Sequence, residues 1–277
     1  METTVLALML CLVMTSFSME SFSIPLSMMD KSVDDMYDGC SEAMAERVNH
    51  TYFPREMKKN QLFKEAWNKM ESCANNKYNR RTNMALTKDQ VHALGVYTGD
   101  DVYGEFNAAV RVSADKYVSN SFKYHALYYW LVSALQTLNN NKICRTTYRR
   151  SEHTFTGQLN QEIRFGQFAS SSLRPDVVEF GDETCFQIET CLGAPINEYS
   201  CFSNEDEVLI PPYEKFKIID IKHCSYQRLE DCKKIFVLKH VGTKTKLNCK
   251  AAYMKKLFNN IRKEIENIFN SVRNFFS

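Results

Sequence analysis

The spacing of apolar residues divides the chain into a helical first half and a strand-rich second half. The clearest helical segment places Leu127, Leu131, Ala134 and Leu138 on one face, and a run of three asparagines, 139–141, ends it. Two other segments have mixed apolar spacing and few β-branched residues. The predicted helices are Glu56–Asn75, Asp101–Val112 and Ser121–Leu138.

In the second half, short apolar or alternating runs recur between turn signals such as Pro211-Pro212 and Gly193-Ala194-Pro195. Helices followed by strands favour an α+β domain over a doubly wound α/β sheet. The absence of a G-x-G-x-x-G motif among nine glycines also argues against a Rossmann fold. The predicted strands are Ile143–Tyr148, Glu162–Phe168, Thr184–Thr190, Val208–Ile210, Phe216–Ile221 and Lys234–His240.

The two ends of the chain differ from the middle. Val5–Val13 is an apolar run too short to span a bilayer, and small residues follow it, so residues 1–18 are predicted to be a signal peptide. Residues 251–277 have the apolar spacing of an amphipathic helix with basic residues between. We expect this helix to pack on the domain of residues 19–250. Binding to a membrane surface is the less favoured alternative, and the segment lacks the uncharged tail of a lipid anchor.

Cysteine content agrees with export. Ten cysteines are present, and nine remain if Cys11 leaves with the signal peptide, which allows up to four disulfides and one unpaired thiol. Asn49-His50-Thr51 is a glycosylation sequon. No metal site is expected, because C-x-x-C and H-E-x-x-H motifs are absent and the histidines are scattered. A net charge of +2 gives no support for nucleic-acid binding.

Three polar clusters in the second half are candidates for chemistry. They are Tyr148-Arg149-Arg150 at the end of a predicted strand, Ser170-Ser171-Ser172 after another, and Glu205-Asp206-Glu207 before a third. Each alone is typical of a solvated loop. Together they suit NAD, because a guanidinium offers a fixed fork for a pyrophosphate. Glutamates two apart on an extended strand project to the same face. A serine hydroxyl can hold one of these carboxylates in a fixed rotamer.

The sequence around these clusters resembles the vertebrate arginine-specific ecto-mono-ADP-ribosyltransferases. The resemblance extends from about Asp34 to Cys249, and its motifs occur in the order that the family has. Four segments carry it: Glu105–Arg111 (EFNAAVR), Arg164–Leu173 (RFGQFASSSL), Thr190–Ile196 (TCLGAPI) and Glu205–Glu214 (EDEVLIPPYE). The resemblance implies the ADP-ribosyltransferase fold, in which a helical half precedes a mostly antiparallel, β-sandwich-like half.

The family's active residues are an arginine, a serine and a Glu-x-Glu pair, which fall on Arg149, Ser170, Glu205 and Glu207. The resemblance implies NAD as co-substrate and arginine-containing proteins as acceptors. In the family the second glutamate is indispensable and the first directs transfer to arginine. Ser172 lies close enough in sequence to share the work of the serine. Further NAD contacts are expected at Tyr97, Gln167 and Ser203.

One position departs from the family pattern. The active arginine is normally followed by a glycine whose backbone lies close to the nicotinamide, and here the next residue is Arg150. A side chain at this position is expected either to crowd the pocket or to demand a different backbone angle. The departure puts NAD affinity in question.

The resemblance also implies two disulfides, Cys40–Cys249 and Cys144–Cys191. Cys224 and Cys232 flank a predicted hairpin and form a candidate extra bridge, whereas the remaining cysteines, Cys73, Cys185 and Cys201, have no assigned partner.

The sequence leaves three alternatives to the transferase. The first is an NAD glycohydrolase, in which water replaces the arginine acceptor. The second is a secreted binding protein of the same fold whose catalysis is lost through Arg150. The third is a membrane-active protein acting through the helix of residues 257–275. The intact arginine, serine and Glu-x-Glu set ranks the transferase above them, as a secreted protein in preference to one anchored at the cell surface.

Overall fold

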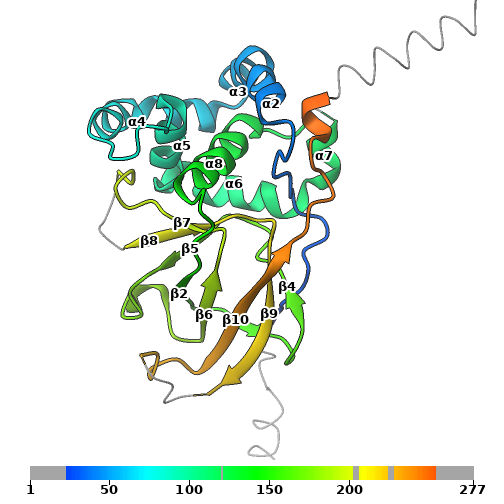
Figure 1. Cartoon of the computed structure of the whole chain (residues 1–277), viewed down its shortest axis with the longest axis vertical. Helices are drawn as coiled ribbons and strands as arrows, with labels where there is room; N and C mark the ends of the chain where they lie inside the picture. Colours follow the sequence, from blue (N-terminus) through cyan, green and yellow to red (C-terminus); the bar gives the residue numbers. More distant parts are fainter. Residues whose placement is uncertain (1–22, 120, 202–205, 224–227, 254–277) are drawn as a thin grey trace, which may run out of the picture.

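The computed structural model describes residues 23–119, 121–201, 206–223 and 228–253. The predicted signal peptide, the C-terminal amphipathic helix, Ser203, Glu205 and Cys224 therefore lie outside the described residues. Helices form one layer of the molecule and strands form the other (Figure 1). The chain completes the main helical layer before it enters the large sheet, as the order of predicted elements indicated.

The helical layer surrounds α8, which is apolar on nearly every side and is buried from His125 to Leu135. The predicted helix over 121–138 begins four residues late, and it ends at Leu138 before the asparagine run, as predicted. The predicted helix over 56–75 is two helices, because Asn60 is extended and its side chain accepts a hydrogen bond from Phe63 N at 3.2 Å. The helical segments are α2 (Ser41–Arg47), the π-helix η1 (Val48–Tyr52), α3 (Phe53–Lys59), α4 (Gln61–Asn79), α5 (Lys88–Tyr97), α6 (Asp100–Val112), α7 (Ala114–Val118), α8 (His125–Leu138) and the 3₁₀ helix η2 (Val178–Phe180).

The strands form a two-stranded parallel sheet, β1-β3, and an eight-stranded sheet in the order β4-β9-β10-β6-β2-β5-β8-β7. Only the β10–β6 pairing is parallel in the large sheet as described, so its antiparallel character is confirmed. The strands are β1 (Ser23–Pro25), β2 (Arg145–Ser151), β3 (Thr154–Thr156), β4 (Glu162–Ile163), β5 (Ala169–Ser172), β6 (Thr184–Thr190), β7 (Ala194–Pro195), β8 (Glu207–Ile210), β9 (Glu214–Lys222) and β10 (Lys234–Thr243).

Two large apolar cores match the two layers. One is built on α8 and the surrounding helices and includes Leu209 of β8 and Ala194 of β7. The other lies among the strands, where Phe186, Phe216 and Phe236 of the large sheet pack with Phe155 of the small one. Side chains from both sheets share this second core, which gives the strand half its sandwich-like character.

The prediction of a strand over 162–168 followed by a serine loop is wrong in detail. Only Glu162–Ile163 is a strand there, and the serine cluster itself forms β5 between β2 and β8. Ala169 and Ser171 are buried on one side of β5, and backbone pairing on both edges sets this strand despite its polar sequence.

Four disulfides join the described cysteines. Cys40–Cys249 and Cys144–Cys191 are both present, as the resemblance implied. The candidate Cys224–Cys232 bridge is wrong, because Cys232 pairs with Cys185 of β6. The fourth bridge joins Cys73 on α4 to Cys201, six residues before Glu207.

Candidate active site

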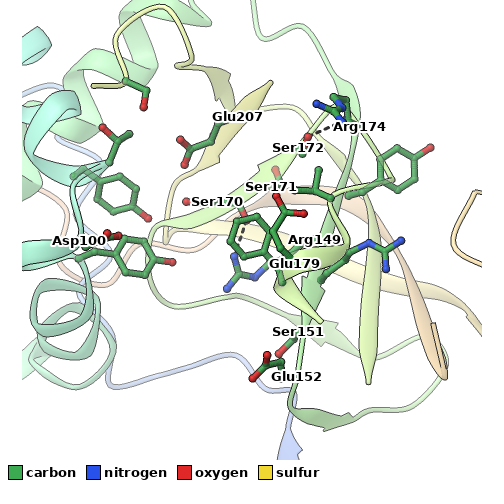
Figure 2. Close-up of a pocket in the computed structure, with 18 of the residues that line it drawn as sticks. Asp100, Arg149, Ser151, Glu152, Ser170, Ser171, Ser172, Arg174, Glu179 and Glu207 are labelled. Atoms are coloured by element: carbon green, nitrogen blue, oxygen red, sulfur yellow. Dashed lines mark hydrogen bonds between the residues drawn. The ribbon is translucent and has the colours of Figure 1, made fainter. Parts of the chain in front are cut away.

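A pocket of about 630 Å³ opens between the helical layer and the edge of strands β2, β5 and β8. Figure 2 shows Arg149, Ser170 and Glu207 pointing into the same space, with Asp100 on the helical side. The strands bring these residues together because β5 pairs with β2 on one edge and with β8 on the other. The lining includes Tyr97, Asp100, Tyr103, Arg149, Arg150, Glu152, His153, Ser170, Ser172, Arg174, Pro175, Val177, Glu179, Phe180 and Glu207.

Arg149 lies near the end of β2, where it pairs with Phe186 of β6. Its Nη1 donates a hydrogen bond of 2.6 Å to the backbone oxygen of Ser170. A guanidinium has five N–H donors, so this bond fixes the group and leaves others for a ligand. This hydrogen bond thus holds the guanidinium of Arg149 at the strand side of the pocket.

Ser170 and Ser172 alternate with Ser171 along β5 and so share one face of the strand. Ser171 faces the other way and donates its hydroxyl to the backbone oxygen of Val208 at 2.9 Å. The register places Ser172 directly opposite Glu207 and Ser170 opposite Leu209. Side chains directly opposite across a pair are closer than diagonal ones, so Ser172 is at least as well placed as Ser170 to contact Glu207.

Glu207 is the first residue of β8, and its backbone oxygen accepts a hydrogen bond of 2.9 Å from Ile196 N. The preceding residue, Asp206, has a φ of 49°, in the left-handed region. Aspartate visits this region more readily than most residues. Glu205 lies outside the described residues, so the expectation that it shares a face with Glu207 stays a prediction.

Tyr97, at the end of α5, lines the pocket but is only 1% exposed. Its hydroxyl donates to the backbone oxygen of Phe168 at 3.1 Å and accepts from the side-chain amide of Asn107 at 3.3 Å. Burial raises the pKa of this hydroxyl well above its ordinary value, against the effect of hydrogen bonds from Ser170 and Asn107. Tyr97 thus fixes the segment that leads into β5.

Gln167 does not line the pocket as described, because its side-chain oxygen accepts a hydrogen bond from Arg111 of α6. Burial lowers the pKa of Arg111, and the charge of Arg149 adds to this effect. Arg111 belongs to the EFNAAVR segment, but its residue type and position do not distinguish it from the solvated charges of a helix face.

Arg150 is directed away from Arg149, since neighbouring residues of a strand point to opposite faces. Its Nη1 and Nη2 bind the two carboxylate oxygens of Asp231 at 2.6 and 3.0 Å. Its Nε donates to the backbone oxygen of Pro175 at 3.0 Å. Arg150 is nevertheless one of the residues that line the pocket, and these bonds to Asp231 and Pro175 fix its guanidinium at the pocket edge.

Several lining residues were missed from the sequence. Asp100, Glu152, Arg174 and Glu179 are charged residues with no motif to distinguish them from a solvated surface. Among them, only Asp100 had a sequence signal for the pocket, because it follows Tyr97, a predicted NAD contact, by three residues. In the part of the chain that the structure describes, no group of side chains has the composition of a metal site, and no helix is both long and apolar enough to cross a bilayer.

Comparison with known proteins agrees with this geometry. The family model for NAD:arginine ADP-ribosyltransferase matches residues 26–232. The chain is 37% identical over 207 residues to the erythroblast NAD(P)(+)–arginine ADP-ribosyltransferase of Gallus gallus, an alignment that covers 70% of this chain and 67% of that protein. It is 34% identical to ecto-ADP-ribosyltransferase 4 of Homo sapiens, over 69% and 64% of the two chains. The matched region thus spans about two thirds of the length of these relatives.

Solved structures give the same result. The eukaryotic mono-ADP-ribosyltransferase ART2.2, as its E189A mutant in complex with NADH, superimposes with a TM-score of 0.68 at 31% identity. That match covers 82% of this chain and 98% of the other. The E189I mutant of the same protein in complex with NAD gives a TM-score of 0.68 as well. The chain therefore belongs to the NAD:arginine ADP-ribosyltransferase family.

Proposed function

We propose that this NAD-dependent arginine ADP-ribosyltransferase works in the pocket formed by Arg149, Ser170 and Glu207. The observation that carries the proposal is the convergence of a held cation, a hydroxyl and a carboxylate on one cavity of about 630 Å³. This volume lies within the range of small-molecule sites. Family membership supplies NAD as co-substrate and arginine as acceptor.

In this proposal the guanidinium of Arg149 binds the pyrophosphate of NAD. Its hydrogen bond to the backbone of Ser170 sets its direction before the ligand arrives, which lowers the entropy cost of binding. Tyr97 supports the start of β5 from the helical side, through its hydrogen bond to the backbone of Phe168. Gln167 acts on the site indirectly, by accepting a hydrogen bond from Arg111. Ser203 remains a proposed NAD contact outside the described residues.

Reaction begins when the bond between the ribose C1′ and the nicotinamide nitrogen breaks, and nicotinamide leaves with the bonding electrons. Positive charge then develops on the ribose, as in glycoside hydrolysis. Glu207 stabilises this charge electrostatically, oriented by the serines of β5. A guanidinium nitrogen of the acceptor forms the new bond to C1′ and loses one proton. Free arginine is too weak an acid to lose that proton beforehand, so Glu205 accepts it as the bond forms.

The test supplies labelled NAD and a small guanidine acceptor to the wild type and to Glu207→Gln. We expect at least a 100-fold lower rate of transfer in the variant, since electrostatic groups of this kind contribute on the order of 10² to 10³ in rate. Glu162→Gln is the matched control, because Glu162 lies on β4 in an exposed ion pair with Lys215. Equal transfer by Glu207→Gln and the control would refute the assignment.

The same assay separates the transferase from an NAD glycohydrolase. Glu205→Gln is expected to lose transfer to the guanidine while it keeps hydrolysis of NAD. Loss of both reactions together would show that the two glutamates do not divide the work in this way. A wild type that releases ADP-ribose only into solution would favour the glycohydrolase.

We also propose that the protein acts outside the cell. Four disulfides among the described residues suit an oxidising compartment. Asn49 of the sequon is exposed, as a glycan attachment site requires. The predicted signal peptide of residues 1–18 accounts for export, and secretion is favoured over anchoring at the surface.

A further inference from the structure

Arg150 makes an ion pair with Asp231 in which the guanidinium is buried and the carboxylate is half exposed. Its side chain is 4% exposed, whereas that of Asp231 is 47% exposed. Both terminal nitrogens of the guanidinium bind the carboxylate in a two-pronged arrangement, the strongest geometry available to this pair. The contact with Arg150 lowers the pKa of Asp231, so the carboxylate stays charged at neutral pH.

The segment that carries Asp231 is itself fixed to the sheet. Cys232 forms the disulfide to Cys185, and Cys185 is the cross-strand partner of Arg150 between β2 and β6. Cys185, Cys232 and Leu229 are buried together in a small apolar cluster. Asp231 is therefore held beside Arg150 by a covalent bridge that starts from the residue paired with Arg150.

Pro175, whose backbone oxygen accepts the hydrogen bond from Arg150 Nε, belongs to a wall of the pocket. We define the pocket wall as Leu173–Gly181, which contributes Arg174, Pro175, Val177, Glu179 and Phe180 to the lining. Much of this wall lacks a core of its own, since Val178 and Phe180 are 59% and 47% exposed. A segment with few buried apolar contacts depends on hydrogen bonds for its order.

Hydrogen bonds and close packing attach both ends of the pocket wall. At its start, Leu173 N donates to the backbone oxygen of Asp206 at 3.1 Å. At its end, Gly181 packs so closely on Glu152 that a Cβ there would lie 2.6 Å from Glu152 N. Among the described residues, the hydrogen bond that reaches the middle of the wall from another segment comes from Arg150 to Pro175.

We propose that Arg150 is a positioning residue for NAD: paired with Asp231, it holds the middle of the pocket wall in the conformation that binds the dinucleotide. This inference rests on the proposed function of the pocket. It reverses the expectation from the sequence that Arg150 weakens the site. The glycine usual in the family is replaced by a side chain that lines the pocket and binds the backbone of Pro175 in the wall.

The experiment compares Arg150→Gly, Arg150→Lys and Asp231→Asn with the wild type, with Lys215→Gln as the control. Lys215 also forms an ion pair with a carboxylate, but on β9 with Glu162. Steady-state kinetics give KM for NAD, KM for the guanidine acceptor and kcat. Hydrogen–deuterium exchange of residues 173–181 reports the order of the pocket wall without turnover.

For Arg150→Gly we expect about a 10-fold higher KM for NAD, the order of one charge-assisted hydrogen bond. The KM for a small guanidine should not change, and exchange in the pocket wall should become faster. Asp231→Asn should shift both readouts in the same direction, although Asp231 does not line the pocket. Arg150→Lys should recover part of the effect, because it keeps the charge but loses the fork.

An unchanged KM for NAD and unchanged exchange in Asp231→Asn would overturn the proposal, as would a gain of activity in Arg150→Gly. Asp231→Asn decides the case if Arg150→Gly does not fold, since Asp231 is half exposed. Lower stability with an unchanged KM would show a structural role only, and would also overturn it. If the wild type consumes no NAD, the proposed function fails, while exchange still reports whether Arg150 orders the wall.

Discussion

Replacing Glu214 with alanine should destabilise the protein more than any change of an exposed carboxylate. Glu214 begins β9 and is fully buried. One carboxyl oxygen accepts hydrogen bonds from the backbone N–H groups of Cys191 and Leu192, at 2.8 and 3.2 Å, and lies 2.7 Å from His240 Nδ1. The other accepts from the Thr190 hydroxyl at 2.6 Å.

The alanine variant removes the partner of one buried backbone donor, Cys191 N, and of one partly buried donor, Leu192 N, and such a loss costs about 1–3 kcal/mol where the donor is buried. The empty volume and the lost contact with His240 add to this, so we expect a loss of about 4 kcal/mol. A domain of this size changes its Tm by about 2–4 °C per kcal/mol, which predicts a fall of about 8–16 °C. Differential scanning calorimetry measures the change directly.

Glu162→Ala is the control, because Glu162 is half exposed and its ion pair with Lys215 should contribute less than about 1 kcal/mol. The bonds of Glu214 hold the turn that leads into β7, which pairs with β8, the strand that begins at Glu207. We thus expect transfer activity to fall on heating before the control loses it. A Tm of Glu214→Ala within about 2 °C of the control would refute this reasoning.

Two other predictions concern stability. Burial raises the pKa of Asp35 from 3.8 to about 6, so its contribution is fully present below pH 4 and is lost as the pH rises through 6. The free energy of unfolding should therefore decline by up to about 3 kcal/mol from this residue over that range, and urea unfolding of Asp35→Asn at pH 4 to 7 should lack the decline. Replacing Cys73 and Cys201 together by serine should lower the free energy of unfolding by about 2–5 kcal/mol, as expected for a bridge across 128 residues, and an unchanged calorimetric Tm would contradict this estimate.

The sequence predicted those parts of the fold in which local pattern and tertiary structure agree. The strand over Thr184–Thr190 is β6 without a change of bounds, because its apolar residues are buried between β2 and β10. Helix α5 was missed even though Thr87 and Gln90 form a capping box, a signal visible in the sequence. Strand β5 was missed for a different reason, since its serines have no strand preference and only pairing on both edges makes them a strand.

The candidate site shows the same limit. Arg149, Ser170 and Glu207 were predicted because motifs surround them, and all three line the same pocket. The ion-pair partner of Arg150 had no signal in the sequence, because Asp231 lies 81 residues away. Cys185–Cys232 and Cys73–Cys201 were equally beyond reach, since the partner of a cysteine depends on which segments the fold brings together.

The clamp of Arg150, Asp231 and the Cys185–Cys232 bridge also makes the two members of the ion pair unequal. Without Asp231, a guanidinium whose side chain is 4% exposed would lose its counter-charge, whereas without Arg150 the carboxylate of Asp231 would still be 47% exposed to water. A charge that is buried without a partner costs more free energy than one that water can solvate. Arg150 therefore depends on Asp231 more than Asp231 depends on Arg150.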